Sequence, residues 1–230
     1  MHPARLRQVL GALPAIALML PTWAPPPVAA AAQPCPDVEV VFARGTFEPP
    51  GVGATGQAFI DALQGRLPGR PIDVYPVNYP ASLDFPRAAD GVADASTKIV
   101  TLVNDCPNTR IVLGGYSQGA AVAAYTTTDA LPSGYVLPTG INGPMPADIS
   151  KHVAAVVLFA MPTNDFVGVL DRNAPPITIG ARYSPKTLQL CVPDDPICSP
   201  TGGDQSAHGA YTGNGMTDQG ADFAAHALGI

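Results

Sequence analysis

The chain is poor in charged residues, which make up 13% of its 230 residues, and it has no cluster of basic side chains. Only 12 residues are lysine or arginine, against 18 aspartates and glutamates. Binding to a nucleic acid or to an anionic lipid surface depends on concentrated positive charge. The composition therefore argues against nucleic acid and anionic membranes as electrostatic partners.

Three further patterns are missing from the sequence. No internal repeat or low-complexity linker follows residue 32, so we expect a single domain. No Cys-x-x-Cys or close pairing of cysteine with histidine indicates a zinc site, and the chemistry inferred below requires no metal or other cofactor. No segment after residue 32 is long and apolar enough to cross a membrane, which takes about 20 residues. We therefore expect a soluble protein without stable membrane insertion.

The first 32 residues have the parts of a secretory signal peptide. Two arginines precede an apolar run over residues 9–20, and small residues follow up to Ala32. The run is too short, and too interrupted by glycine and proline, for a membrane-spanning helix, although a retained anchor is the alternative. We predict cleavage after Ala32, or alternatively after Ala30, and one mature domain over residues 33–230. Without the two arginines its net charge is near −8.

All four cysteines lie after the predicted signal peptide, at Cys35, Cys106, Cys191 and Cys198. An even number of cysteines in an exported chain indicates two disulfides, for which three pairings are possible. Cys191 and Cys198 stand seven residues apart around two prolines. This spacing favours a local bridge between them and leaves Cys35 with Cys106. The longer bridge would contribute about 4 kcal/mol on the chain-entropy model.

Apolar runs alternate along the chain with amphipathic segments. We expect strands over residues 38–43, 72–77, 110–115, 153–159 and 187–191. We expect helices over residues 57–67, 88–103 and 118–127, and one at the C-terminus. The run Val153–Phe159 is apolar throughout, which is typical of a strand buried on both faces of a helix-covered parallel sheet. The alternation predicts an α/β fold, a three-layer α/β/α sandwich with a mostly parallel five-stranded central sheet.

The pentapeptide Gly115-Tyr116-Ser117-Gln118-Gly119 fits the pattern Gly-x-Ser-x-Gly and lies between a predicted strand and a predicted helix. The flanking glycines allow a sharp turn that lifts the serine Oγ out of the sheet. Gln118 begins the helix, so its backbone N–H can point at a developing oxyanion. An ordinary tight turn is the alternative. The setting between strand and helix favours Ser117 as a nucleophile.

A serine hydroxyl needs a histidine to take its proton, and a carboxylate must orient that histidine. Three histidines follow the signal peptide: His152, His208 and His226. His152 precedes a buried strand at the sheet end opposite the nucleophile, and His226 lies in the apparent terminal helix. We expect neither to be catalytic. His208 lies in a glycine-rich loop after the last strand, where a rigid scaffold usually holds catalytic groups.

The candidate carboxylates lie close to the last predicted strand. Asp194 and Asp195 are inside the predicted local disulfide loop, which would hold a carboxylate in place. Asp165 and Asp204 are the alternatives. The order serine, aspartate, histidine is that of the α/β-hydrolases and not that of the two well-known serine protease folds, which favours ester hydrolysis.

Four blocks of the sequence resemble the cutinase family, in particular the cutinase-like proteins of actinobacteria. They are Phe42-Ala43-Arg44-Gly45-Thr46, Gly114-Gly115-Tyr116-Ser117-Gln118-Gly119-Ala120, Cys191-Val192-Pro193-Asp194-Asp195-Pro196-Ile197-Cys198 and His208-Gly209-Ala210-Tyr211. With Cys35 they extend over nearly the whole predicted mature chain. Their joint spacing is highly specific.

The resemblance implies a small, lidless α/β-hydrolase of the cutinase type with the two disulfides favoured above. It implies Ser117 as nucleophile, Asp195 as acid and His208 as base. The backbone N–H groups of Thr46 and Gln118 would form the oxyanion hole, with the Thr46 hydroxyl as a third donor. The alternative for Thr46 is a simple turn-forming role.

One loop departs from the fungal cutinases, in which the segment between the second loop cysteine and the histidine is apolar. Here the segment Ser199–Ala207 is polar. Exposed apolar area is what would bind a waxy surface, so this loop argues against cutin as the substrate. We expect Leu83 and Phe85, in another proline-rich loop, to supply a smaller apolar rim.

We therefore expect a secreted, monomeric serine carboxylesterase that hydrolyses short-to-medium acyl esters, lipid-like or polyester, through an acyl-enzyme intermediate. Its partner is a small ester or lipid substrate, and the protein is either released or kept on the cell envelope. The alternatives among enzymes are a cutin or polyester depolymerase, a phospholipase A and a cell-envelope acyltransferase. From another class, the alternative is a secreted binding or antigenic protein with a vestigial site.

Overall fold

Five parallel strands form one sheet in the order β2-β1-β3-β4-β5. The computed structural model describes residues 34–131, 136–137 and 139–230, so the predicted signal peptide lies outside the described residues. The strands are β1 (Val38–Ala43), β2 (Ile72–Pro76), β3 (Arg110–Tyr116), β4 (Val153–Phe159) and β5 (Thr187–Leu190). Each expected strand is confirmed to within one residue at either end, and the α/β prediction is confirmed.

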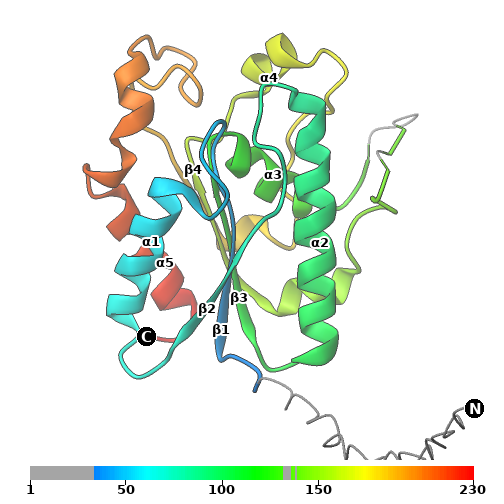
Figure 1. The fold of residues 1–230 in the computed structure, drawn as a ribbon, viewed down its shortest axis with the longest axis vertical. Coiled ribbons are helices and arrows are strands. Elements are labelled where there is room, and N and C mark those ends of the chain that lie inside the picture. Colours follow the sequence, from blue (N-terminus) through cyan, green and yellow to red (C-terminus); the bar gives the residue numbers. More distant parts are fainter. Residues whose placement is uncertain (1–33, 132–135, 138) are drawn as a thin grey trace, which may run out of the picture. The chain divides into compact units, whose positions relative to one another are not determined.

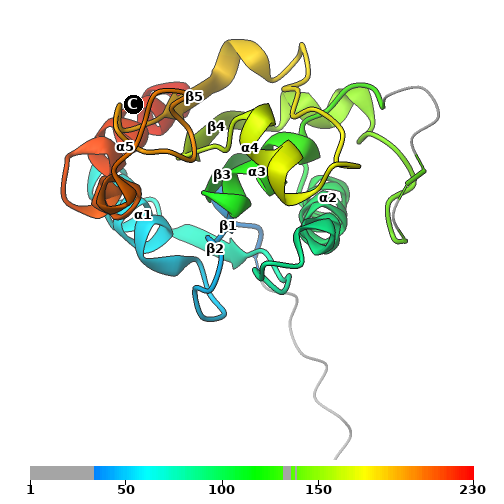
Figure 2. The ribbon, with the colours of Figure 1, turned by 90° about the horizontal axis from the view of Figure 1, so that it is seen from above.

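Helices cover both faces of the sheet. They are α1 (Gly53–Arg66), α2 (Ala88–Asp105), α3 (Gln118–Thr126), α4 (Asn164–Leu170) and α5 (Met216–Ala227). Short 3₁₀ segments are η1 (Phe85–Arg87), η2 (Ala147–Lys151), η3 (Ser184–Lys186) and η4 (Gln205–Thr212). Helices α1 and α5 pack on one face, and α2 and α3 pack on the other (Figures 1 and 2). The expected three-layer arrangement is thus observed. Among the described residues, no helix has the length and apolarity needed to cross a membrane.

The core has two halves because successive side chains of a strand point to opposite faces. In β1, Val38, Val40 and Phe42 pack with the residues of α1 and α5. Val41 and Ala43 pack with the residues of α2 and α3. All six side chains of this strand are buried. Strand β1 is therefore apolar enough to be covered on both sides, as β4 is.

Helix α1 begins four residues earlier than its apolar pattern predicts. The extra turn contains Gly53 and Gly56, which in a sequence are typical of a loop. A Cβ atom on Gly56 would lie 2.7 Å from a carbon of the Phe42 ring. Glycine there lets the first turn of α1 lie directly against β1, so packing overrides the low helix propensity of glycine.

Two disulfides link segments that precede or follow the strands of the sheet. Cys35 is bonded to Cys106, with the Cα atoms 5.5 Å apart, which ties the segment before β1 to the end of α2. Cys191 is bonded to Cys198, with the Cα atoms 5.8 Å apart, directly after β5. Both pairs are those that the sequence predicts. The second bridge closes the short loop that carries Asp194 and Asp195.

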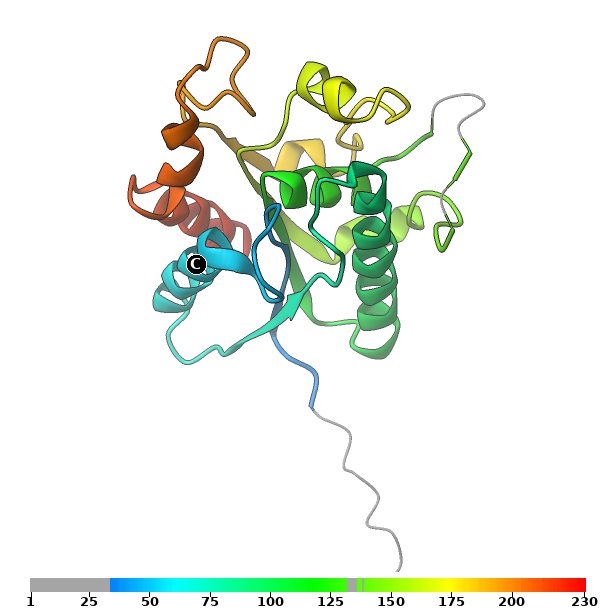
Figure 3. The ribbon, with the colours of Figure 1, turned by 45° about the horizontal axis from the view of Figure 1, so that its top comes forward.

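The carboxyl ends of all five strands lie along one edge of the sheet, where ligands bind in open α/β folds. Figure 3 turns this edge toward the viewer and shows α4 and the orange segment that follows β5 lying there. Thr46 follows β1, Ser117 follows β3, and Asp195 and His208 follow β5. The parallel topology therefore gathers residues that are far apart in the sequence.

Candidate active site

Ser117 joins β3 to α3 in a backbone conformation that residues with a side chain rarely adopt. Its φ is 55° and its ψ is −121°. Its N–H donates a 2.9 Å hydrogen bond to the carbonyl of Phe159, the last residue of β4. Its own carbonyl accepts the Ala120 N–H at 2.9 Å, which starts α3. The strained turn is thus held from both sides, as is usual for backbone strain at functional sites.

The two glycines of the pentapeptide are needed for close packing. A Cβ atom on Gly115 would lie 2.1 Å from the carbonyl oxygen of Gly119. A Cβ atom on Gly119 would lie 2.0 Å from the carbonyl oxygen of Ala43, at the end of β1. Only a residue without a side chain fits at either place. The first turn of α3 therefore lies against the segment that follows β1.

Ser117, His208 and Asp195 form a continuous chain of hydrogen bonds. His208 Nε2 lies 2.9 Å from Ser117 Oγ, and His208 Nδ1 lies 2.8 Å from Asp195 Oδ2. A carboxylate accepts only, so the imidazole carries its proton on Nδ1 and its Nε2 accepts from the serine hydroxyl. Asp195 is completely buried, whereas the His208 side chain is 22% exposed. The arrangement fits an orienting carboxylate behind a histidine that can receive a proton.

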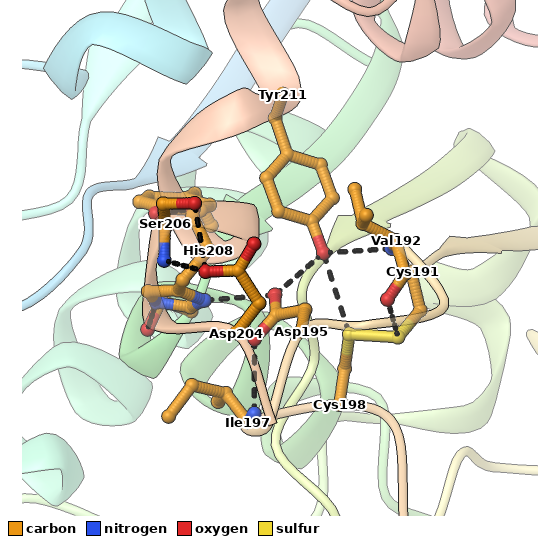
Figure 4. A network of polar contacts seen from close by, with 11 residues as sticks. Cys191, Val192, Asp195, Ile197, Cys198, Asp204, Ser206, His208 and Tyr211 are labelled. Atoms are coloured by element: carbon orange, nitrogen blue, oxygen red, sulfur yellow. Dashed lines mark hydrogen bonds and ion pairs between the residues drawn. A yellow bond between two sulfur atoms is a disulfide. The ribbon is translucent and has the colours of Figure 1, made fainter. Parts of the chain in front are cut away.

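The carboxylate of Asp195 is held by the disulfide loop and by η4. Its Oδ1 accepts the Ile197 N–H at 2.9 Å, and its Oδ2 accepts the Tyr211 hydroxyl at 2.7 Å as well as His208 (Figure 4). The backbone N–H of Asp195 donates to the Val192 carbonyl at 2.9 Å. The loop therefore fixes both the backbone and the carboxylate of this residue.

The imidazole of His208 is held by an aromatic neighbour from β3. The Tyr116 ring stacks on it, with 5.1 Å between centroids and 26° between planes. The Tyr116 hydroxyl donates to the backbone carbonyl of His208. Burial raises the pKa of Tyr116, which keeps the hydroxyl protonated as a donor. The residue before the candidate nucleophile thus orients the candidate base.

The segment that carries Thr46 is shaped by a buried arginine and a glutamate. Arg44 is 5% exposed and donates to the carbonyls of Glu48 at 2.8 Å and Tyr79 at 2.6 Å. The Glu48 carboxylate accepts the backbone N–H groups of Gly45 at 2.6 Å and Ala54 at 2.8 Å. These bonds fix the turn on both sides of Thr46.

The turn lies directly against the start of α3. A Cβ atom on Gly119 would also lie 2.4 Å from the Arg44 carbonyl oxygen. The Gln118 side chain is buried and donates through Nε2 to the Ser82 carbonyl at 2.8 Å. Thr46 and Gln118 thus belong to neighbouring segments of the same edge. This is the placement that a shared oxyanion hole requires.

The alternative residues do not take part in this chain of hydrogen bonds. His152 follows η2 and directly precedes β4, at the opposite edge of the sheet, and His226 is exposed on α5. Asp165 is exposed in the first turn of α4. Asp204 caps η4, where its carboxylate accepts the Ser206 hydroxyl at 2.7 Å and the Ser206 N–H at 2.9 Å. These bonds lower the pKa of Asp204.

The expected apolar rim is only partly present. Leu83 is 69% exposed, but Phe85 is buried, so its expected place at the rim is wrong. Phe85 begins η1, which leads into α2, and its side chain packs into the core half beneath α2 and α3. Phe47 is a second large apolar side chain exposed in this region: it is 74% exposed, and its N–H donates to the Ala81 carbonyl at 2.8 Å.

Sequence reasoning gave no role to several residues that support the site. Tyr116 and Tyr211 lie inside the quoted motifs, yet their contacts depend on how β3, η4 and the disulfide loop meet. Arg44 carried a weak signal, namely an arginine directly after a strand that is apolar except for Glu39. A charge at that position is expected to be paired or otherwise satisfied if it is buried.

Known proteins match this chain over nearly all of its described length. The family model described as Cutinase matches residues 34–228. The carboxylesterase Culp1 of Mycobacterium tuberculosis is 45% identical over 229 residues, covering 99% of this chain and 98% of the relative. The phospholipase Culp4 of the same organism is 44% identical over 208 residues, covering 90% and 84%. A Trichoderma reesei cutinase in complex with a phosphonate inhibitor superposes with a TM-score of 0.63 at 31% identity, covering 86% of this chain and 78% of that chain.

Proposed function

Because the chain belongs to the cutinase family and is a serine ester hydrolase, we propose that Ser117, His208 and Asp195 are its catalytic triad. The observation that carries this proposal is the hydrogen-bonded chain from Ser117 Oγ through His208 to Asp195, on a strained turn between β3 and α3. The activity that it supports is hydrolysis of short-to-medium acyl esters through an acyl-enzyme intermediate.

The proposed reaction has two halves that use the same groups. Ser117 Oγ attacks the ester carbonyl while its proton moves to His208 Nε2, and the buried Asp195 stabilises the imidazolium that forms. The backbone N–H groups of Thr46 and Gln118, with the Thr46 hydroxyl, receive the oxyanion. Collapse of this intermediate returns the proton to the leaving alcohol. Water then attacks the acyl-enzyme by the same route and releases the acid.

The substrate class rests on the surface around the site. The segment Ser199–Ala207 is polar and mostly exposed, so it adds little apolar area for a waxy polymer. Leu83 and Phe47 are the large apolar side chains exposed on the loops next to Gln118 and Thr46. Val169 and Leu170 are also exposed, on α4 at the same edge. This limited apolar area suits an acyl chain of modest length. A phospholipid is the second candidate, favoured by the relative that is named a phospholipase.

The proposal also places the protein outside the cytoplasm. The predicted signal peptide over residues 1–32 would direct export, and two disulfides in 230 residues suit an oxidising compartment. We propose that the mature chain, residues 33–230, acts as a single monomeric domain.

Kinetics of the mature protein test the proposed activity. We expect hydrolysis of p-nitrophenyl esters that is fastest for short-to-medium acyl groups, and a loss of several orders of magnitude in kcat for Ser117→Ala. Ser150→Ala is the matched control, because Ser150 is also buried but lies in η2 at the opposite sheet edge. A short-chain phosphatidylcholine in the same panel distinguishes the phospholipase.

Each outcome of this panel decides between the functions. Unchanged activity in Ser117→Ala would contradict Ser117 as the nucleophile. No activity in any protein of the panel would favour the secreted binding protein with a vestigial site. Turnover of the phospholipid well above that of the simple esters would replace the carboxylesterase with the phospholipase.

A further inference from the structure

Tyr211 is fully buried, although it carries a polar hydroxyl, and it lies three residues after His208 in η4. Its hydroxyl donates to Asp195 Oδ2 at 2.7 Å and accepts the Val192 N–H at 3.1 Å. The Cys198 Sγ lies 3.3 Å from the same oxygen. Figure 4 shows this hydroxyl between the disulfide and the Asp195 carboxylate.

We propose that Tyr211 is a positioning residue of the triad, whose hydroxyl fixes Asp195 and limits the negative charge that Asp195 presents to His208. This proposal rests on the proposed triad of Ser117, His208 and Asp195. It adds a fourth residue that touches neither the substrate nor Ser117 and acts only through the carboxylate.

The hydroxyl has a task that is separate from the packing of the ring. The Tyr211 ring meets the ring of Phe159 edge-on, with 6.4 Å between centroids, and packs near those of Tyr116 and His208 at 5.7 and 6.5 Å. A phenylalanine would keep these contacts. Burial raises the pKa of Tyr211, so the hydroxyl stays protonated and remains a donor at every working pH. A phenylalanine would lose the bond to Asp195, and it would also leave the Val192 N–H without this acceptor.

The first effect of this bond is geometric. Asp195 Oδ2 is shared between His208 Nδ1 at 2.8 Å and the Tyr211 hydroxyl at 2.7 Å, while Oδ1 accepts the Ile197 N–H. Donors on both oxygens prevent the carboxylate from rotating. Without the hydroxyl, His208 is the remaining donor to Oδ2. The carboxylate is then less restrained, and it orients the imidazole less well.

The second effect is electrostatic, and its sign can be worked out. A hydrogen bond from Tyr211 stabilises the charge on Oδ2 and weakens its attraction for an imidazolium. Removing the bond therefore favours protonated His208. Because the attack needs neutral His208, the acidic limb of the rate profile should move to higher pH. Tyr116 from β3 also lies against the pair and feels Glu48 from the turn after β1. Asp194 adjoins Asp195 in the loop, and Asp204 caps η4. All four groups remain in the variant.

The test compares kcat and KM of the mature protein and two variants from about pH 5 to pH 9. For Tyr211→Phe we expect kcat to fall roughly ten-fold with KM nearly unchanged, and the acidic limb of kcat/KM to rise by about half a pH unit. Tyr125→Phe is the matched control, since it removes a hydroxyl that donates to the Pro175 carbonyl at 2.6 Å, away from the triad. We expect its profile to coincide with that of the unmodified protein.

A Tyr211→Phe profile that coincides with the control in both kcat and acidic limb would overturn the proposal. If this variant fails to fold, replacement of Tyr211 alone by 3-fluorotyrosine tests the same bond. Fluorine makes the Tyr211 hydroxyl a stronger hydrogen-bond donor to Asp195, so the acidic limb of the profile should move to lower pH. No movement there would likewise overturn it. Ser117→Ala in the same assay tests the triad itself, so failure of the triad is distinguished from failure of the role of Tyr211.

Discussion

Asp194 and Asp195 are adjacent in the sequence but differ completely in their surroundings. Asp194 is exposed, and its backbone carbonyl accepts the Asp204 N–H at 3.0 Å. Asp195 is completely buried, and three donors reach its carboxylate. A buried carboxylate without partners would be costly, and these three donors offset that cost for Asp195.

Exchange of each aspartate for asparagine gives a matched pair of variants. Asp195→Asn keeps the shape but removes the charge that stabilises an imidazolium, so we expect kcat to fall by about four orders of magnitude. Asp194→Asn keeps its backbone bond and should retain activity within about two-fold. Steady-state kinetics on a p-nitrophenyl ester measure both. Equal losses in the two variants would mean that the loop as a whole, and not the Asp195 carboxylate, supports the reaction.

At the scale of elements, the turn between β3 and α3 depends on the absence of side chains. The Cβ of an alanine at 119 would meet backbone atoms of Ala43 and Arg44, which cannot move without shifting β1. The segment with Thr46 and the start of α3 are therefore fitted to one another. Any bulk between them separates the two halves of the proposed oxyanion hole.

Gly119→Ala should lower the free energy of unfolding by about 3 kcal/mol and also reduce kcat, because the new methyl group forces this separation. Gly65→Ala is its control in another helix. A Cβ atom on Gly65 would point into open space near the end of α1, so we expect a gain of up to about 1 kcal/mol and unchanged kinetics. Urea unfolding monitored by circular dichroism measures both. Similar stabilities for the two variants would contradict the close fit.

The strands were predictable because β4 is apolar throughout, β1 is interrupted only by Glu39, and the shorter runs are rich in β-forming residues and bounded by turn residues. Helix α4 was not predicted, since its seven residues are too few to show a helical period. Its visible signal is local: Thr163 caps it by accepting the Phe166 N–H at 3.1 Å. The prediction for Phe85 was wrong for a similarly local reason. Its proline-rich surroundings suggest an exposed loop, whereas the start of η1 directs its side chain into the core.

The candidate site also has residues that the sequence predicts and contacts that it does not. Motif order and loop position favoured Ser117 and His208 but left Asp194 and Asp195 open, and the resemblance to the cutinases implied Asp195. The structure brings Ser117, His208 and Asp195 within hydrogen-bonding distance. The bond from Tyr211 to Asp195 was not predicted, because it joins η4 to the disulfide loop through residues that are 16 apart in the chain. Contacts between loops have no periodicity in a sequence. They follow only from the packed fold.

At the scale of the whole molecule, the parallel sheet assembles the site without a separate covering domain. The described residues form one sheet with its helices, and loops occupy its carboxyl edge. Ser117 lies at this edge, and the neighbouring Gln118 donates to the Ser82 carbonyl in the loop that carries Leu83. We therefore expect the serine to react in plain aqueous solution, with no need for a lipid surface to open the site.

Covalent trapping of Ser117 tests the central claim most directly. The mature protein is treated with a water-soluble alkyl phosphonate in the absence of lipid and detergent, and its intact mass and peptide map are measured. We predict one phosphonyl group per chain, located on Ser117, with activity lost in proportion to labelling and no labelling in Ser117→Ala. Labelling at another residue, or full activity in a protein labelled at Ser117, would contradict the account.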